Sequence, residues 1–187
     1  MSATNRGNKR SAYDFYATPI ECIEKLLDNF ILEKSNINIL EPSAGNGNII
    51  KVLRDRGING NITAVEIREE EYNNLLKLAD KVVIDDFLQW NTNKHYDLII
   101  GNPPFSLAKE FIEKCFEISN KKTKIVMLLR TSFLESKSRY DFWQKHPLSN
   151  LYVLSKRPSF TGKGTDATSY AWFIWNKSSD KQEIKVI

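Results

Sequence analysis

The stretch that decides the fold of this chain spans residues 97–105 and reads Asp97-Leu98-Ile99-Ile100-Gly101-Asn102-Pro103-Pro104-Phe105. Its apolar residues 98–100 are typical of a buried strand. The strand ends before two prolines, which have a fixed φ and no backbone donor. Pro104 also favours an extended conformation for Pro103. An amide, a free carbonyl and an aromatic ring are therefore held rigidly at a strand end. A planar ligand bearing an –NH₂ needs these three groups, although a plain strand-terminating turn would use the same prolines.

A strand, a glycine-rich turn and a helix precede this stretch. The strand at 37–41 leads into Pro42-Ser43-Ala44-Gly45-Asn46-Gly47, and apolar residues from Ile49 onward predict the helix. Glycines in such a turn let the backbone approach a ligand at the helix N-terminus. The third glycine of a dinucleotide fingerprint is absent. The acid before the turn, Glu41, suits a cationic ligand better than a pyrophosphate.

Two further strands also end in acids. Glu66 lies near the end of a strand at 62–67, where a carboxylate can accept hydrogen bonds from ribose, and Asp86 follows the strand that starts at Lys81. Because the carboxyl ends of parallel strands share one sheet edge, these acids, the glycine turn and Asn102 should lie together. Four polar positions on one edge favour a binding site over four unrelated turns.

The remaining pattern predicts the fold class. Helices alternate with strands through a fifth strand at 124–130, and no helix-length segment separates the last two strands, at 151–154 and 170–175, so these should pair antiparallel. We expect an α/β protein, a Rossmann-like three-layer α/β/α sandwich with a seven-stranded, mostly parallel sheet and an antiparallel last strand. It should form a single domain over 13–187 after a flexible basic tail at 1–12. Thr18 should cap the first helix, with Pro19 as its first residue.

Composition limits the classes of protein. The chain has 187 residues, 41% apolar and 27% charged, and a net charge of +4 that permits a nucleic-acid partner. No run of 18 apolar residues and no secretory signal is visible, so we expect a cytoplasmic protein without membrane segments. Cys22 and Cys115 fall on apolar helix faces and are interpreted as reduced core thiols. His95 and His146 have no ligand-spaced partners, so no metal site is expected.

On these motifs the chain resembles the class I, S-adenosylmethionine-dependent amino-methyltransferases, and within them the small N6-adenine DNA methyltransferases of phages and prophages. Asn102-Pro103-Pro104-Phe105 is similar to the family's catalytic motif, and residues 14–19 resemble its N-terminal motif. The motif order is the family's gamma arrangement. The resemblance implies S-adenosyl-L-methionine as cofactor, DNA as partner, and direct methyl transfer to the amino group of a flipped-out adenine.

The resemblance also implies roles for individual residues. The catalytic group would be Asn102, Pro103, Pro104 and Phe105. The cofactor would be bound by Thr18, Pro19, Glu41, Pro42, Ala44, Gly45, Gly47, Glu66, Ile67, Asp86, Phe87 and Asn102. The substrate would be bound by Phe105, Arg157, Phe160 and Lys163, with Phe160 as a second stacking face for the base.

Other functions stay open at this point. The same tetrapeptide is found in methyltransferases that act on ribosomal or transfer RNA and on a glutamine amide. A non-catalytic nucleic-acid-binding subunit is a further alternative, which the complete set of motif residues disfavours. The sequence ends soon after the seventh predicted strand, so we expect short or relaxed site recognition, or recognition supplied by a partner.

Overall fold

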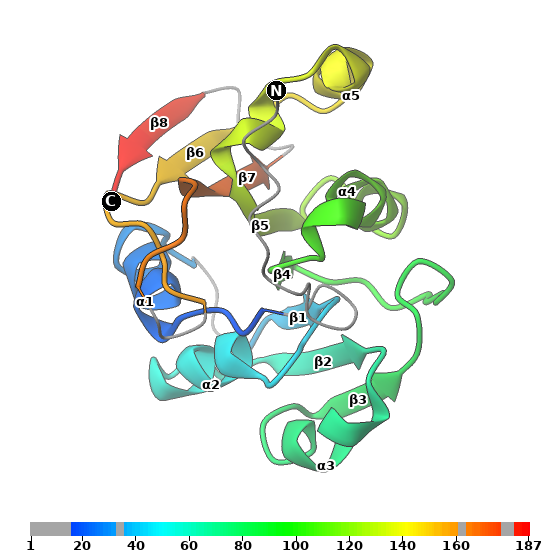
Figure 1. The fold of residues 1–187 in the computed structure, drawn as a ribbon. Helices are drawn as coiled ribbons and strands as arrows, with labels where there is room; N and C mark the ends of the chain where they lie inside the picture. The colour runs from blue at the N-terminus through cyan, green and yellow to red at the C-terminus, as the bar shows by residue number, and fades with distance from the viewer. Residues whose placement is uncertain (1–15, 33–35, 161–163, 177–181) are drawn as a thin grey trace.

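The computed structural model describes residues 16–32, 36–160, 164–176 and 182–187, which form a sheet with helices on both faces (Figure 1). The sheet order is β3-β2-β1-β4-β5-β7-β6-β8. The strands are β1 (Asn38–Glu41), β2 (Asn61–Glu66), β3 (Lys81–Ile84), β4 (Leu98–Gly101), β5 (Lys124–Arg130), β6 (Asn150–Val153), β7 (Tyr170–Asn176) and β8 (Glu183–Val186). The helices are α1 (Ile20–Asn29), α2 (Asn48–Asp55), α3 (Tyr72–Leu75), α4 (Ala108–Glu117) and α5 (Tyr140–Lys145).

The two faces of the sheet have separate apolar cores. One core joins the sheet to apolar residues of α1, α2 and α3, among them Ile23, Ile50 and Leu75. The other joins it to α4 and α5 through residues such as Ile112 and Phe142. The predicted three-layer α/β/α sandwich is therefore confirmed.

The centre of the sheet is buried on both faces. Residues 125–129 of β5 are fully buried, as their uninterrupted apolar run predicts. β7 pairs antiparallel with both β5 and β6, and its large side chains, Trp172 and Trp175 among them, fill both cores. The predicted antiparallel strand is confirmed.

The strand order reverses between β1 and β4, and this is where ligands bind in open α/β sheets. The turn after β1 approaches the end of β4 closely. A Cβ on Gly101 would lie 3.2 Å from Cδ of Pro42, so a glycine at this position lets the two segments meet. The sheet thus brings the glycine-rich turn against the Asn102–Phe105 motif.

The prediction of seven strands is wrong, because β8 adds an eighth. This strand runs parallel to β6 at the edge of the sheet, and its Ile184 and Val186 are 74% and 72% exposed. Backbone hydrogen bonds hold it, for example from Ile187 N–H to the Val153 carbonyl at 2.8 Å. A strand secured by backbone pairing, with exposed apolar side chains, lacks the buried pattern that signals a strand in sequence.

The predicted cap of the first helix is also wrong. α1 begins at Ile20 with Pro19 as its N-cap, and no side chain caps it. The extended conformation that a following proline favours keeps Thr18 outside the helix. Instead, the Thr18 carbonyl accepts a hydrogen bond from Asn48 Nδ2 at 2.8 Å. The predicted tail at 1–12 and the first two residues of the N-terminal motif at 14–19 lie outside the described residues.

Both cysteines are buried and free, as predicted. Burial raises the pKa of Cys22 to about 12, so this thiol stays protonated. The described residues include no cluster of three or more His, Cys, Asp or Glu that could hold a metal ion. No helix in the same ranges is long and apolar enough to cross a membrane.

Candidate active site

A cavity of about 300 Å³ lies at the switch point between β1 and β4. Its wall comes from the segment before α1, the turn after β1, the segments after β2 and β3, and the motif after β4. Most predicted site residues line it, namely Thr18, Glu41, Pro42, Ala44, Gly45, Glu66, Ile67, Asp86, Phe87, Asn102, Pro103, Pro104 and Phe105. The fold therefore gathers strand ends that are far apart in sequence around one space.

Other predicted site residues lie outside this wall. Pro19, Gly47, Arg157 and Phe160 do not line the cavity, and Lys163 lies outside the described residues. Gly47 serves the turn instead. It has a φ of 79° at the N-cap of α2, and a Cβ there would lie 2.5 Å from Cδ1 of Leu78.

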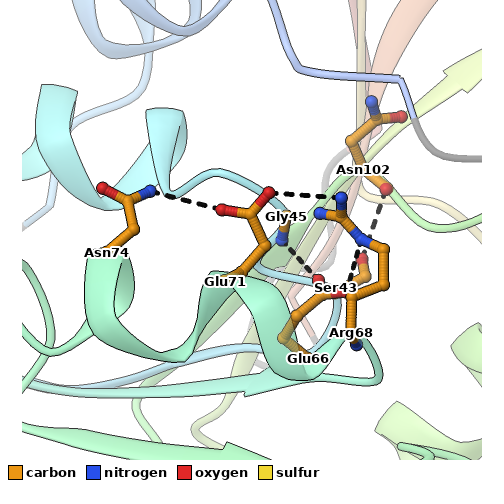
Figure 2. Close-up of polar contacts among 7 residues, drawn as sticks. All are labelled: Ser43, Gly45, Glu66, Arg68, Glu71, Asn74 and Asn102. Atoms are coloured by element: carbon orange, nitrogen blue, oxygen red, sulfur yellow. Dashed lines mark hydrogen bonds and ion pairs between the residues drawn. The ribbon is translucent and has the colours of Figure 1, made fainter.

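Glu66 is the centre of a polar network in the cavity wall (Figure 2). Its Oε2 accepts from Gly45 N–H at 2.6 Å, and its Oε1 accepts from Arg68 N–H at 3.0 Å and from Arg68 Nε at 2.9 Å. The Arg68 guanidinium also pairs with Glu71 at 3.2 Å. Since the Glu66 and Arg68 side chains are only 5% and 10% exposed, these bonds fix the carboxylate in place.

Glu41 is a buried acid with an unused oxygen. It is 2% exposed and lines the cavity, and its Oε2 has no hydrogen-bond partner among the described residues. Burial, and then the negative charge of Glu66, raise its pKa well above the ordinary value of 4.5, while a hydrogen bond from the Ile50 backbone lowers it. A cationic ligand in the cavity would stabilise the ionised form of Glu41.

Asn102 presents a second unused acceptor. Its Nδ2 donates to the Tyr16 carbonyl at 3.2 Å, while its buried Oδ1 has no partner in the described part of the chain. Ser43 Oγ donates to the Asn102 carbonyl at 3.2 Å and ties the motif to the glycine-rich turn (Figure 2). The orientation of the amide leaves Oδ1 available to a donor on a ligand.

Asp86 and Phe87 form the wall after β3. One Asp86 oxygen accepts from Leu88 N–H at 3.0 Å, which orders the turn. Phe87 is 2% exposed, and its ring centroid lies 5.2 Å from the ring centroid of Phe111. The Phe87 ring is thus a core group that also contributes to the cavity wall.

Phe105 is surrounded by rings and a cation. The Arg130 guanidinium lies over it, with Cζ 4.9 Å from the ring centroid, and Tyr170 and Phe160 lie 5.4 and 6.2 Å away, centroid to centroid. The Tyr170 hydroxyl accepts from Arg130 Nε at 3.2 Å and donates to Asp166 at 3.0 Å. Packing on several sides holds the Phe105 ring at the cavity edge.

The cavity also includes residues that the sequence analysis did not assign. These are Tyr16, Ala17, Ser43, Asn46, Asn48, Ile49, Arg68, Asp85, Ser106, Leu107 and Phe111. Ser43 and Asn46 lie inside the glycine-rich turn, so their place in it was a usable signal. Arg68 carries no motif signal, because its pairing with Glu66 depends on side-chain direction.

The chain is similar to known methyltransferases. It is 32% identical to the type II methyltransferase M.CvrRI of Paramecium bursaria Chlorella virus XZ-6E, over 77% of this chain and 49% of that protein. It is 27% identical to the modification methylase CviBIII of Paramecium bursaria Chlorella virus NC1A, over 71% and 41%. It is 30% identical to the ribosomal RNA small subunit methyltransferase A of Flavobacterium johnsoniae, over 52% and 40%. The chain thus spans less than half the length of each relative, and no family model matches it.

Solved structures show the same fold. A Listeria monocytogenes protein assigned to the class I S-adenosylmethionine-dependent methyltransferases aligns with a TM-score of 0.70 at 15% identity, over 91% of this chain and 65% of that one. A Pyrococcus horikoshii protein assigned as an RNA methyltransferase aligns with a TM-score of 0.67 at 17% identity, over 96% and 92%. The predicted Rossmann-like methyltransferase fold and the resemblance to methyltransferases are confirmed. The cofactor that these relatives and neighbours imply is S-adenosylmethionine.

Proposed function

We propose that this chain transfers a methyl group from S-adenosylmethionine to the exocyclic amino group of adenine in DNA. The observation that carries the proposal is the unpartnered Oδ1 of Asn102, a buried acceptor in the cavity wall whose amide is oriented by the Tyr16 carbonyl. A buried acceptor without a donor is costly, and an amino group would remove that cost. The similarity to viral DNA-modification enzymes supports DNA as the substrate.

The residues present fit a cationic nucleoside cofactor. The unpartnered Oε2 of Glu41 is an acceptor for a positive charge. We assign the buried carboxylate of Glu66, at the end of β2, to the ribose hydroxyls. We assign Thr18, Gly45, Asp86 and the other predicted cofactor residues of the cavity wall to the same ligand. When bound, S-adenosylmethionine supplies a methyl group activated by its attachment to a sulfonium.

Asn102 and Pro103 make the amine a better nucleophile. The lone pair of an aromatic amine is delocalised into its ring, so hydrogen bonds that draw the nitrogen toward tetrahedral geometry localise that lone pair. We assign Asn102 Oδ1 and the Pro103 carbonyl as the two acceptors, because the Pro104 carbonyl already accepts from Leu107 N–H at 2.9 Å. The same two dipoles stabilise the positive charge that develops on nitrogen during direct displacement.

Phe105 would hold the ring of the base. The base must leave the stack before its amine can enter the cavity, which costs a few kcal/mol in a duplex. Stacking on an aromatic ring offsets part of this cost, by about 1–3 kcal/mol per base. The Arg130, Tyr170 and Phe160 contacts hold the Phe105 ring ready for that stacking.

An RNA adenine is the second candidate substrate, because two relatives are named as RNA methyltransferases, one for ribosomal RNA and one for N6 of an adenine in transfer RNA. The Asn102–Phe105 motif would hold the same amine in either nucleic acid. A glutamine amide and a non-catalytic binding role have no comparable support among the relatives.

The test is nucleoside mass spectrometry after incubation with labelled S-adenosylmethionine and duplex DNA, single-stranded DNA or RNA. We expect labelled N6-methyladenine in DNA. If label appears only in RNA, the RNA function replaces the proposed one. If no substrate is labelled although the protein binds the cofactor, the enzymatic role is wrong.

A further inference from the structure

A second aromatic ring at the cavity comes from a segment far from the motif in sequence. Tyr16 lies just before α1 and lines the cavity beside Phe105. The two ring centroids are 6.3 Å apart, and the planes differ by only 17°. The Tyr16 carbonyl accepts from Asn102 Nδ2 at 3.2 Å, so the same residue is tied to the proposed amine-binding side chain.

The other rings around Phe105 have different orientations. Phe160 meets Phe105 at 71° and Tyr16 at 63°, so its plane is parallel to neither ring. Tyr170 is tilted by 49° to Phe105 and is fully buried. Among these three described neighbours, Tyr16 alone is both close to parallel with Phe105 and part of the cavity wall.

We propose that Tyr16, rather than Phe160, provides the second aromatic face against which the target base stacks. This inference rests on the proposed function and deepens it. A flat base gains most from rings whose planes are nearly parallel to its own, whereas a ring at 71° packs against its edge. Phe160 and Tyr170 then act as side walls that hold Phe105.

Tyr16 links the stacking of the base to the orientation of the proposed acceptor, Asn102 Oδ1. The Tyr16 carbonyl orients the Asn102 amide, and the Tyr16 ring would stack on the base. One residue therefore sets both the plane of stacking and the direction in which Asn102 Oδ1 points. Loss of the ring alone should weaken capture of the nucleic acid and leave the amide in place. The effect should therefore fall on the base and not on the cofactor.

The experiment compares Tyr16→Leu, Tyr16→Phe and Tyr16→Trp with the wild-type protein. We expect Tyr16→Leu to lower kcat/KM for the nucleic acid by about 5- to 150-fold, which is the range that stacking predicts. Tyr16→Phe and Tyr16→Trp, which keep a ring, should retain most of the activity. Cofactor affinity, measured by calorimetry, should not change. The control is Tyr140→Leu, on a tyrosine of α5 that is 62% exposed and outside the cavity wall.

A fluorescent base reports the stacking directly. The probe is the substrate oligonucleotide with 2-aminopurine in place of the adenine that the wild-type protein methylates, whether that substrate proves to be DNA or RNA. We expect the bound base to be quenched by the wild-type protein and brighter in Tyr16→Leu. Equal fluorescence with unchanged kcat/KM in Tyr16→Leu would overturn the role of Tyr16, and so would a loss confined to cofactor affinity. Absence of any methylated nucleoside with the wild-type protein would instead count against the proposed function.

Discussion

The two ends of the cavity are built in different ways. The acidic end contains Glu41 and Glu66, the last residues of the neighbouring parallel strands β1 and β2, and Gly45, whose N–H donates to Glu66 Oε2 at 2.6 Å. The aromatic end contains Asn102, Phe105 and Tyr16, where the segment before α1 meets the end of β4. The acidic end thus depends on local turns and adjacent strands, whereas the aromatic end depends on the contact between two distant segments. A change at either end should therefore have its own signature.

The largest effect is expected from removing the proposed acceptor of the aromatic end, Asn102 Oδ1. Asn102→Ala removes Oδ1 and should lower kcat by about 100- to 1,000-fold, as loss of a preorganised group facing a developing charge does in other enzymes. Cofactor affinity should fall far less than kcat. Steady-state kinetics and calorimetry measure the two quantities. Asn91→Ala, on an exposed asparagine outside the cavity wall, is the control, and full activity in Asn102→Ala would remove Asn102 from the mechanism.

A substitution at the acidic end should instead lower cofactor affinity more than kcat. Glu66→Ala removes the buried acceptor together with its 2.9 Å ion pair to Arg68 Nε. We expect cofactor affinity to fall by about 10- to 100-fold, while kcat at saturating cofactor changes less. Calorimetric titration checks this, with the exposed Glu70→Ala as control. Unchanged affinity would show that Glu66 is a structural acid only.

The turn that carries Gly45 also contains Gly47, and a comparison with Gly57 shows what this second glycine contributes. Gly47 and Gly57 share a backbone conformation but differ in what surrounds them. Gly47 and Gly57 have φ values of +79° and +73°, but a Cβ would meet Leu78 at 2.5 Å at the first position and nothing within 4 Å at the second. Gly47→Ala should therefore lower the free energy of unfolding by about 1–3 kcal/mol more than Gly57→Ala does. Urea unfolding of both variants tests the difference. Equal losses would mean that backbone strain alone explains Gly47.

The smallest effect concerns the charge of Glu41. Its pKa is raised in the folded protein above the ordinary 4.5, so the folded state binds this proton more tightly than the unfolded state. Stability from this source is present below pH 4.5 and is lost as pH rises through the raised pKa. Glu41→Gln cannot ionise, so without cofactor it should unfold a few degrees above the wild-type protein at pH 8, given about 2–4 °C for each kcal/mol.

The test is to measure the thermal unfolding midpoints of the wild-type protein and of Glu41→Gln between pH 4.5 and pH 8. The two midpoints should converge toward pH 4.5, where Glu41 is protonated in both states of the wild-type protein. Curves that stay parallel at all pH values would contradict a raised pKa for Glu41. Bound cofactor should reduce the difference at pH 8, because a cation favours the ionised carboxyl.

The acidic end was more accessible to sequence reasoning than the aromatic end. Glu41, Gly45 and Glu66 were placed from their positions after predicted strands, and all line the cavity. Tyr16 was not assigned, whereas the family resemblance indicated Phe160 as the second stacking face. The angle between two ring planes depends on side-chain packing, which leaves no trace in residue spacing. Arg68 was missed for the same reason.

The sequence by itself determined the alternation of strands and helices, the antiparallel pairing of β7, and the set of polar residues at the strand ends. These features follow from hydrophobic periodicity and from turn chemistry, which are local. The tertiary structure alone decided that β8 joins the edge of the sheet and that Tyr16 lies parallel to Phe105. It also decided that Asn102 Oδ1 and Glu41 Oε2 are buried without partners. Such features depend on segments far apart in the chain, because burial and ring orientation exist only once those segments have packed together.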